Sequence, residues 1–404
     1  MKKILIIATF FGLLIQFNTN IKASTTETFY ISAMYTDISV TLYDGATSEQ
    51  IDKITEIFKT YDHLAHNFDG PNLSHTNPLY HKNNIVSINE KAGIEPVVVD
   101  PLLYDMIKSG LALYDETDGY FNPAMGQVID IWKDLILSDY INQEIPQSLF
   151  EDTMALINAY EGDINPDDII LNDTDKSVYI SNPDLKLDLG AYAKGYATEL
   201  VKAYLIEQNV EHYIVNTGNS TISLGTHPDD GEIDRPLSIR ILDPLNLYQN
   251  GTAGLLYVRN KSVSTSGNNI QFVTYQGKRY HHIISPFELV PMDYYHSVTL
   301  LGDDAGILDA LSTALFNMPL EDAKVLLDHF DVEGLFYMQD GSIETYNMTS
   351  KFEQGDLIEE RTDLSTLYLI LGAVILLGGG TVITLSLLEK KKPKAVNDDV
   401  KEEA

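Results

Sequence analysis

The chain has 404 residues, of which 44% are hydrophobic, and this is enough to build a real core in one large domain or two average ones. Its 59 acidic and 27 basic residues give a formal net charge of −32, which argues against binding to nucleic acid and against docking of the folded part on anionic lipid. The chain contains no cysteine, so disulfides, thiolate nucleophiles and cysteine-ligated metals are excluded.

The first residues have the pattern of an export signal. Lys2 and Lys3 precede an apolar run at 4–17, and a polar stretch then ends at Ala23. This pattern predicts a signal peptide over residues 1–23, with an uncleaved anchor as the alternative.

A second apolar segment lies near the other end of the chain. Residues 364–388 carry no charge and are numerous enough to span a bilayer, which predicts a transmembrane helix. A buried core helix is the alternative, but Gly378-Gly379-Gly380 and the lysines at 390–394 favour the membrane. Lysines that flank a membrane span tend to stay in the cytoplasm. We therefore expect the charged tail, residues 389–404, to be cytoplasmic. We therefore expect a single-pass protein of the cell membrane whose domain, residues 24–355, is extracytoplasmic.

Hydrophobic periodicity predicts both strands and helices within that domain. Apolar and polar residues alternate from Thr28 to Tyr43, a pattern typical of a strand pair or of one long strand. The further predicted elements are helices at 48–61 and 101–114, strands at 178–182 and 186–190, a strand–turn–strand unit at 213–225, a strand at 297–301 and the amphipathic helix that follows it.

The stretch Asp188–Ala197 (D-L-G-A-Y-A-K-G-Y-A) has the features of a nucleotide site. A predicted strand ends in Asp188, Gly190 allows a sharp turn, and small residues begin a helix. Free backbone amides at the start of a helix can hold phosphate, and Lys194 adds a positive charge beside them. From these residues alone, a packed strand–helix corner with a surface lysine remains the alternative.

The segment from His281 to Met318 places polar groups in apolar surroundings. On its predicted helix Asp309 and Thr313 are four residues apart, so they project from the same face. A carboxylate stacked on a hydroxyl is a hard-oxygen site, suited to a Mg²⁺ ion that holds a phosphate. The alternative is a first-turn aspartate favoured by the helix dipole, with Thr313 bonded back to a carbonyl.

These and other motifs follow the order of one family. His282–Pro286 (H-I-I-S-P), Ser297–Thr299 (S-V-T) and Asp309–Phe316 (D-A-L-S-T-A-L-F) resemble the carboxy-terminal signature of the ApbE family, the FAD:protein FMN transferases. Upstream stretches that resemble the family are Met34–Thr36, Ser87–Asn89, Thr117–Trp132, Asp188–Ala197, Tyr213–Gly225 and Ser262–Asn268. The resemblance covers residues 28–348 and implies a single α+β catalytic domain with mixed or antiparallel sheets and flanking helices.

The resemblance also implies an activity and a set of site residues. A Thr or Ser hydroxyl on an acceptor protein attacks the FMN phosphorus of FAD, and AMP leaves. His282 then acts as the base, and Mg²⁺ is held by Asp309, Thr313 and the main-chain oxygen of Ala191. The residues implied to contact FAD are Met34, Asn89, Asp188, Lys194, Thr265, Ser266 and Gly267. Thr265, Ser266 and Gly267 can equally be an ordinary hairpin end, and Asn89 can equally form an Asx turn.

Several positions depart from the family pattern. Tyr35 and Asn219 stand where the family has glycine, Ser285 replaces the aspartate of H-I-I-D-P, and Glu288-Leu289 replaces Thr-Gly. Asparagine and glycine both occupy the left-handed region that a tight turn requires, so the change at Asn219 is mild. Since the other motif residues remain, we predict an active transferase. The alternatives are an FAD-binding surface protein without catalysis, a Mg²⁺-dependent FAD pyrophosphatase that releases FMN and AMP, and a surface interaction module, which would leave the ordered motifs unexplained.

Overall fold

The structure is a computed structural model that describes residues 25–67, 77–160, 164–230, 233–245 and 251–355. The predicted signal peptide, the predicted transmembrane helix and the charged tail lie outside the described residues and stay predictions. Within the part of the chain that is described, no helix is both long and apolar enough to cross a membrane.

An eight-stranded antiparallel sheet forms the centre of the larger of two compact units, which comprises the described residues up to Ile239 together with Leu256–Lys351. In spatial order its strands are β1 (Glu27–Ala33), β2 (Thr36–Leu42), β6 (Tyr213–Thr217), β7 (Thr221–Leu224), β10 (Lys261–Gly267), β13 (Tyr295–Gly302), β14 (Glu333–Met338) and β15 (Ile343–Tyr346). The strand pair predicted at 28–43 and the strand–turn–strand unit predicted at 213–225 are confirmed.

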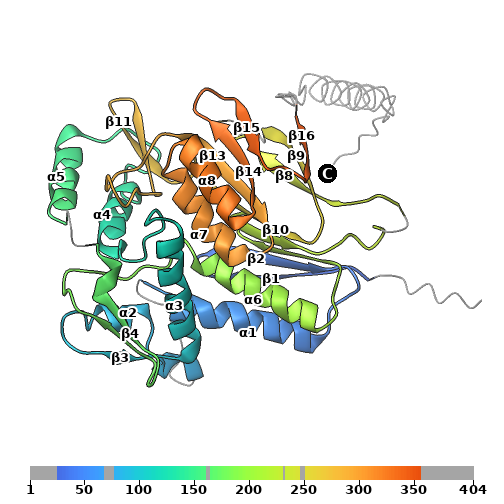
Figure 1. Ribbon diagram of the computed structural model, residues 1–404, viewed down its shortest axis with the longest axis horizontal. Helices are drawn as coiled ribbons and strands as arrows, with labels where there is room; N and C mark the ends of the chain where they lie inside the picture. The colour runs from blue at the N-terminus through green and yellow to red at the C-terminus, as the bar shows by residue number, and fades with distance from the viewer. Residues whose placement is uncertain (1–24, 68–76, 161–163, 231–232, 246–250, 356–404) are drawn as a thin grey trace, which may run out of the picture. The chain divides into compact units, whose positions relative to one another are not determined.

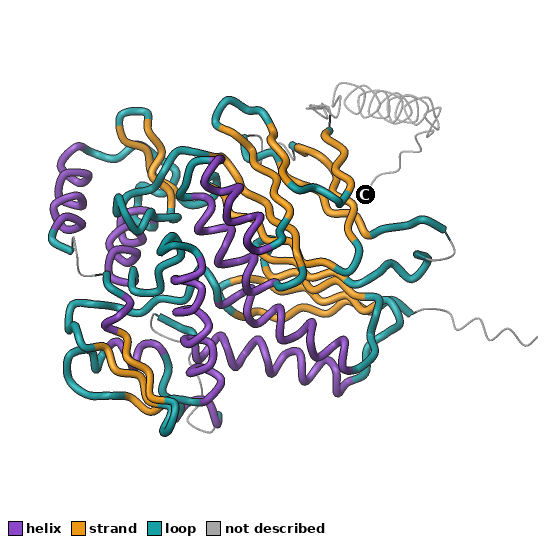
Figure 2. The backbone as a smooth tube through the Cα atoms, in the orientation of Figure 1, coloured by secondary structure: helices purple, strands orange, loops and turns teal. Residues whose placement is uncertain are grey.

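Helices α1 (Ser48–Leu64), α6 (Ala193–Glu207) and α7 (Ala305–Phe316) pack side by side against this sheet, with α8 (Leu320–Phe330) next to α7. Figure 1 and Figure 2 show these helices along one face of the strands. Local sequence explains where two of them begin. Thr47 and Gln50 form a capping box at the start of α1, and the Asp304 side chain accepts a hydrogen bond from the Ile307 amide at the start of α7.

The other elements of the larger unit surround the sheet. They are η1 (Pro78–His81), α2 (Ile85–Asn89), β3 (Val97–Val98), α3 (Pro101–Glu116), α4 (Gly126–Ile136), α5 (Gln147–Asn158), η2 (Pro166–Asp168), β4 (Ile169–Asn172), β5 (Ser177–Ile180), β11 (Phe272–Tyr275) and β12 (Lys278–His281). Strands β3, β5 and β4 form a small antiparallel sheet, and β11 pairs with β12. Trp132, on α4, is buried and donates a hydrogen bond to the Leu289 carbonyl at 2.8 Å, so its role is structural.

The strand predicted at 186–190 is wrong. Only Lys186 forms a bridge, with Met125, and the residues that follow belong to no sheet. The reason is that their backbone groups bond elsewhere. The Leu187 amide donates to the Asn89 side chain at 2.8 Å, and the Asp188 amide donates to the Pro123 carbonyl at 2.8 Å.

The smaller unit comprises residues 240–255 and the chain from Phe352 onward. Its described part contributes to a three-stranded sheet in the order β16 (Lys351–Gln354), β9 (Thr252–Val258) and β8 (Leu237–Leu242). Gly254 allows close packing there, because a Cβ atom at this position would lie 2.5 Å from the Phe352 ring. None of the predicted site residues belongs to this unit.

Candidate active site

The turn before α6 holds Asp188 in a fixed orientation. One carboxylate oxygen accepts a hydrogen bond from the Gly190 amide at 2.6 Å, and the other accepts one from the Asn67 side chain at 2.7 Å. The aspartate is buried, with 8% of its surface exposed. Asn67 belongs to no motif that the sequence offered, so its role could not be predicted.

Asn89 supports the same turn from α2. Its side-chain amide donates to the Leu187 carbonyl and to the Asn67 side chain, both at 2.9 Å, and its oxygen accepts from the Leu187 amide. These partners are distant in sequence, so the bonds are not those of an Asx turn. The structure therefore places Asn89 behind Asp188, where it fixes both Asn67 and the chain that leads into the helix.

Asp309 lies at the start of α6, although it belongs to α7. Its Oδ2 accepts a hydrogen bond from the Gly195 amide at 2.8 Å, and its Oδ1 accepts from the Thr221 hydroxyl at 3.0 Å and the Ser264 hydroxyl at 3.3 Å. Only 4% of its surface is exposed. The first-turn interpretation is wrong for its own helix, because Asp304 occupies the N-cap of α7. The helix whose amide and dipole act on this carboxylate is α6.

Gly195 makes this contact possible. A Cβ atom at this position would lie 2.3 Å from the Ala305 carbonyl oxygen and 2.4 Å from the Asp309 Cβ atom. The first turns of α6 and α7 therefore approach each other at a distance that no larger residue allows.

Hydroxyl groups surround the buried carboxylate. Ser264 and Ser266, on β10, lie 3.5 and 2.9 Å from the Ser312 hydroxyl of α7, and Ser312 donates to the Asp309 carbonyl at 3.0 Å. The bond back to a carbonyl that was considered for Thr313 is thus made by Ser312. Thr313 lies one turn after Asp309, partly buried.

Thr265 is not brought to this cluster. Side chains alternate along a strand, and the Thr265 hydroxyl contacts Thr299 of β13 at 2.9 Å, on the other face of the sheet. Gly267 is the last residue of β10 and pairs with Ser297. Of the three predicted contacts on β10, Ser266 is therefore the one that lies beside α7.

His281 and His282 are neighbours with different surroundings. His281 is fully buried, its Nε2 lies 3.0 Å from the Met292 carbonyl, and its Nδ1 accepts from the Ile283 amide at 3.2 Å. These partners require the tautomer with a proton on Nε2. Burial lowers the pKa of His281 to about 3, so the ring is neutral and both nitrogens are occupied. His281 is therefore no candidate for the base.

The His282 side chain is exposed to water, yet the protein around it lowers the pKa of the ring to about 4. A hydrogen bond to the Gln271 backbone opposes the shift, and the positive charge of Lys194 adds to it. Because one ring nitrogen bonds to the Gln271 backbone, the other carries the lone pair that a base requires. The structure thus brings His282 within the electrostatic reach of the start of α6.

Lys133 is a charged group near the site that no sequence motif predicted. It lies on α4 and is partly buried. Burial lowers the pKa of its ammonium group, and the negative charges of Asp188 and Asp130 partly oppose this shift. Its Nζ lies 6.0 Å from the centre of the Tyr35 ring. Lys133 directly follows the core residue Trp132 and belongs to no motif, so the sequence gives no signal for its position near the site.

Met34 and Tyr35 form the two-residue turn between β1 and β2. Both have positive φ, 53° and 57°, and the Met34 amide donates to the Asp62 carboxylate at 2.6 Å. The turn after β6 approaches the same hairpin, because a Cβ atom on Gly218 would lie 1.9 Å from the Thr36 hydroxyl oxygen. The glycine-dependent turn at Gly218 therefore packs closely against the β1–β2 hairpin.

A model of the ApbE family matches residues 34–336. The chain belongs to the ApbE family of flavin transferases.

Relatives with this family's activity in their names match nearly two thirds of the chain. The FAD:protein FMN transferase of Klebsiella pneumoniae (strain 342) is 29% identical over 264 residues, which are 65% of this chain and 77% of the relative. That of Rhodobacter capsulatus is 30% identical over 258 residues, 63% of this chain and 46% of the relative. Among solved structures, the ApbE protein of Thermotoga maritima has a TM-score of 0.65 at 23% identity and covers 80% of this chain and 97% of its own. The flavin transferase ApbE of Vibrio cholerae has a TM-score of 0.61 at 21% identity, with coverages of 80% and 97%. At these identities the structural likeness shows the fold alone.

The oxygen atoms around Asp309 fit the Mg²⁺ ion that the ApbE family implies. Within the described ranges, no cluster of three histidine, cysteine, aspartate or glutamate side chains forms a metal site. The local donors are instead one carboxylate, several hydroxyls and main-chain carbonyls, which are hard ligands. Oδ2 of Asp309 accepts one hydrogen bond, from Gly195, so a second lone pair remains for a cation.

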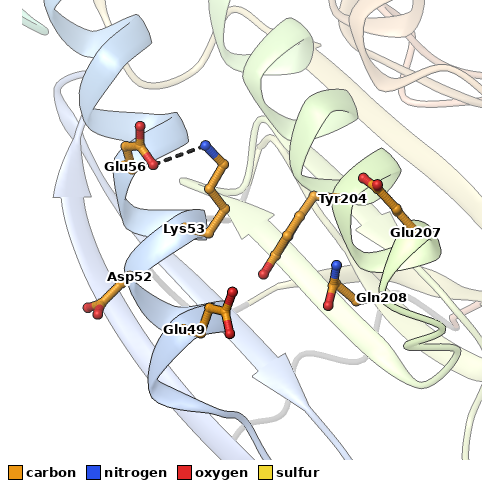
Figure 3. Close-up of a pocket in the computed structure, with 7 residues that line it drawn as sticks. All are labelled: Glu49, Asp52, Lys53, Glu56, Tyr204, Glu207 and Gln208. Atoms are coloured by element: carbon orange, nitrogen blue, oxygen red, sulfur yellow. Dashed lines mark hydrogen bonds and ion pairs between the residues drawn. The ribbon is translucent and has the colours of Figure 1, made fainter.

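A separate hollow of about 660 Å³ lies between α1 and α6 (Figure 3). Its lining residues are Glu49, Asp52, Lys53, Glu56, Tyr204, Glu207 and Gln208. Lys53 is the basic residue of this lining, and its ammonium group pairs with Glu56 at 3.0 Å. The other carboxylates keep the lining strongly acidic, so it would repel a dinucleotide. Tyr204 is also about 15 Å along α6 from Lys194, at a rise of roughly 1.5 Å per residue. This hollow is therefore not the ApbE site.

Proposed function

We propose that this chain transfers FMN from FAD to a Thr or Ser hydroxyl of an acceptor protein and releases AMP, in a Mg²⁺-dependent reaction on the extracytoplasmic face of a membrane. The observations that support the proposal are that Asp188 and Asp309 accept hydrogen bonds from the Gly190 and Gly195 amides around the start of α6, and that the charge of Lys194, on the same helix, acts on His282, in a chain of the ApbE family.

The start of α6 suits the pyrophosphate of FAD. Tyr192, at the N-cap, makes no side-chain capping bond. The Ala193 amide donates to the Leu189 carbonyl and the Gly195 amide donates to Asp309, so the attraction for an anion comes mainly from the positive end of the helix dipole. Lys194 is the second residue of the helix and adds a full positive charge. The dinucleotide would therefore bind with its phosphates at this helix end.

Asp309, Thr313 and the main-chain oxygen of Ala191 are the residues that would hold Mg²⁺. A bound Mg²⁺ would neutralise part of the charge that develops on the phosphoryl oxygens. Asp309 requires such a partner in any complex with FAD, because its own negative charge lies at the same helix start as the proposed phosphates.

The chemical step is a displacement at the FMN phosphorus. The acceptor oxygen forms a bond to this phosphorus, the bond to the bridging oxygen breaks, and that oxygen leaves with AMP. The proton of the attacking hydroxyl passes to the free nitrogen of His282, which is neutral at physiological pH because its pKa is lowered. Because the His282 side chain is exposed, an acceptor segment could approach it from solvent.

Ser285 serves the turn that follows His282. Its hydroxyl oxygen lies 3.3 Å from the amides of Phe287 and Glu288, and both amides donate to it. An aspartate at this position could accept the same two bonds, as in an Asx turn. The replacement of the family's aspartate therefore preserves a structural role and is compatible with activity.

The location of the proposed reaction rests on the apolar runs at 4–17 and 364–388. If both act as predicted, the acceptor proteins are exported or have domains outside the cytoplasm. Protease treatment of intact cells tests this, because only an extracytoplasmic domain is accessible to added protease.

The decisive experiment mixes the purified full chain with FAD, Mg²⁺ and a peptide that carries an acceptor Thr in a flavinylation motif. A gain in peptide mass of one FMN, with release of AMP, supports the transferase. Free FMN and AMP with an unmodified peptide would support the pyrophosphatase instead. FAD that stays bound and intact would support a carrier without catalysis.

A further inference from the structure

Two hydrogen bonds cross the junction between α6 and α7 in opposite directions. The Gly195 amide, in the first turn of α6, donates to Asp309 of α7 at 2.8 Å. The Ala305 amide, at the first residue of α7, donates to Oε2 of Glu199 on α6, also at 2.8 Å. In each helix the acceptor lies four residues after the donor, which is about one turn. Each helix therefore satisfies a first-turn amide of the other.

The two helices touch backbone to backbone at this junction. A Cβ atom on Gly195 would lie 2.3 Å from the Ala305 carbonyl oxygen and 2.4 Å from the Asp309 Cβ atom. On the other helix, a Cβ atom on Gly306 would lie 3.4 Å from the Tyr196 Cα atom. Glycine has no side chain that could interlock at these points. The register of α6 and α7 therefore depends on the side-chain hydrogen bonds that cross between them.

Glu199 is a partly buried carboxylate that has a second partner. Its Oε1 lies 3.1 Å from the ammonium group of Lys202, and the two side chains are only 25% and 14% exposed. Lys202 also donates to the main-chain carbonyl of Asp303, two residues before Ala305. Glu199 and Lys202 together therefore bind the start of α7 to α6 at two points.

Asp304 caps the same helix end by a local bond. Its side chain accepts a hydrogen bond from the Ile307 amide at 2.9 Å, so both partners belong to the start of α7. Because Asp304 already supplies the N-cap, the bond from Glu199 is not needed to define where the helix begins. What this bond adds is a fixed position of α7 relative to α6.

We propose that Glu199 is a positioning residue for the Mg²⁺ site, because it keeps α7 in register with the start of α6. The inference deepens the proposed function and rests on it. Two of the proposed ligands, Asp309 and Thr313, lie on α7, and the third, the main-chain oxygen of Ala191, lies just before α6. Mg²⁺ demands near-octahedral geometry with oxygen ligands at roughly 2.0–2.1 Å. A small shift of α7 would therefore move two ligands away from the third.

The test measures the Kd of the purified full chain for ADP by titration calorimetry, at a fixed Mg²⁺ concentration and in EDTA. ADP carries a pyrophosphate but no FMN to transfer, so the ratio of the two Kd values measures metal-linked binding without turnover. Glu199→Ala should reduce this ratio about tenfold, the scale of losing a group that orients metal ligands, and leave the Kd in EDTA unchanged. Glu199→Gln keeps an oxygen that can accept from the Ala305 amide and should retain the wild-type ratio.

Asp304→Ala provides a matched control. It removes a carboxylate of the same charge from the same helix end, and loss of the N-cap should lower Tm, but it removes no hydrogen bond to α6. Its ratio of Kd values should equal that of wild type. In turnover, Glu199→Ala should raise the Mg²⁺ concentration for half-maximal rate about tenfold with little change in kcat at high Mg²⁺. Lower stability alone would not give this split. Glu199→Asp, whose side chain is shorter, replaces Glu199→Ala if the alanine variant does not fold.

Three results would overturn the inference while the proposed function stands. A wild-type ratio in Glu199→Ala would show that the residue is purely structural. An equal loss in Asp304→Ala would show that general weakening of α7 explains the effect, and an equal loss in Glu199→Gln would assign it to charge. If Mg²⁺ does not tighten ADP binding to wild type, the proposed metal site fails and the role of Glu199 fails with it.

Discussion

The carboxylate of Asp309 accepts a hydrogen bond from the backbone amide of Gly195, an amide that lies 114 residues earlier in the chain. This bond brings a buried negative charge to a helix start that is otherwise suited to phosphate. Two anions at one helix end repel each other unless a cation joins them. The arrangement therefore supports the proposed Mg²⁺ dependence on physical grounds.

Replacement of Asp309 by alanine should abolish Mg²⁺-dependent transfer. The change removes the proposed metal ligand and leaves the Gly195 amide and the Thr221 hydroxyl without their acceptor. Unsatisfied buried donors cost about 1–3 kcal/mol each, so the free energy of unfolding should also fall. The checks are the initial rate of peptide flavinylation across a Mg²⁺ titration and the Tm.

Glu333 supplies the control for this loss of stability. It is also 4% exposed and also accepts several hydrogen bonds, from Thr349 and Ser350, but it lies at the start of β14, by Lys261. Glu333→Ala should lower Tm and retain the wild-type rate per folded molecule. Normal turnover in Asp309→Ala would show that the metal assignment is wrong.

Gly195→Ala should destabilise the protein despite the helix position. Alanine is favoured over glycine inside a helix by about 1 kcal/mol, but here its Cβ would meet the Ala305 carbonyl oxygen at 2.3 Å. Forced separation of packed elements costs about 1–3 kcal/mol or more, so the clash should dominate. Chemical denaturation measures the change. A Gly195→Ala protein as stable as wild type would mean that α6 and α7 are less closely packed than the structure shows.

The hydrophobic periodicity of the sequence predicted helices and strands correctly where the backbone also forms the hydrogen bonds of that helix or strand. The hairpin at 28–43 and the helix that carries Asp309 are examples. The prediction failed at 186–190, where strand-like residues bond to the Asn89 side chain and to the Pro123 carbonyl instead of to a neighbouring strand. Periodicity cannot distinguish these two kinds of partner.

Positions of unusual backbone conformation were partly predictable. Asn219 was expected in the left-handed region and has φ of 62°, and Tyr35 and Leu289, also where the family has glycine, have φ of 57° and 54°. The turn geometry thus persists when the glycine is lost. By contrast, the partners of Asp309 come from α6, β7 and β10, and such long-range convergence has no local signal.

Ser285 should tolerate aspartate better than alanine. Aspartate can accept the bonds that the Phe287 and Glu288 amides now donate to the hydroxyl, so Ser285→Asp should retain the turn and give equal or higher activity. Ser285→Ala loses both bonds at a buried position and should lower the free energy of unfolding by about 1–3 kcal/mol. Transfer rates and denaturation of both variants check this. Loss of activity in Ser285→Asp with an unchanged Tm would contradict it.

His281 should make the protein sensitive to acid. Its pKa is about 3 in the folded chain because of burial and near 6.5 when unfolded, so between these values only the unfolded chain binds the proton. Stability is therefore retained above pH 6.5 and falls as the pH drops toward 3, by about 1.4 kcal/mol per pH unit from this group. Denaturation curves at several pH values should show this extra slope in wild type and not in His281→Gln, which keeps a donor and an acceptor without titrating. Parallel pH dependences would contradict the neutral buried ring.

His282 should carry the proton transfer, and its lowered pKa should set the acid limit of the reaction. His282→Ala is expected to reduce the transfer rate about 10²–10⁴-fold, the usual contribution of a general base, with little effect on the Kd for FAD.

In wild type, the acid limb of kcat/KM reports the free enzyme and should fall near pH 4, because the neutral ring persists down to that pH. Lys194→Gln removes a positive charge that lowers this pKa, so the limb should move to higher pH while the overall rate falls through weaker FAD binding. The profile is measured by peptide flavinylation with short assays, each paired with a stability control at the same pH. A wild-type limb centred on pH 6.5, or a shift to lower pH in Lys194→Gln, would show that His282 does not titrate beside Lys194 as the structure indicates.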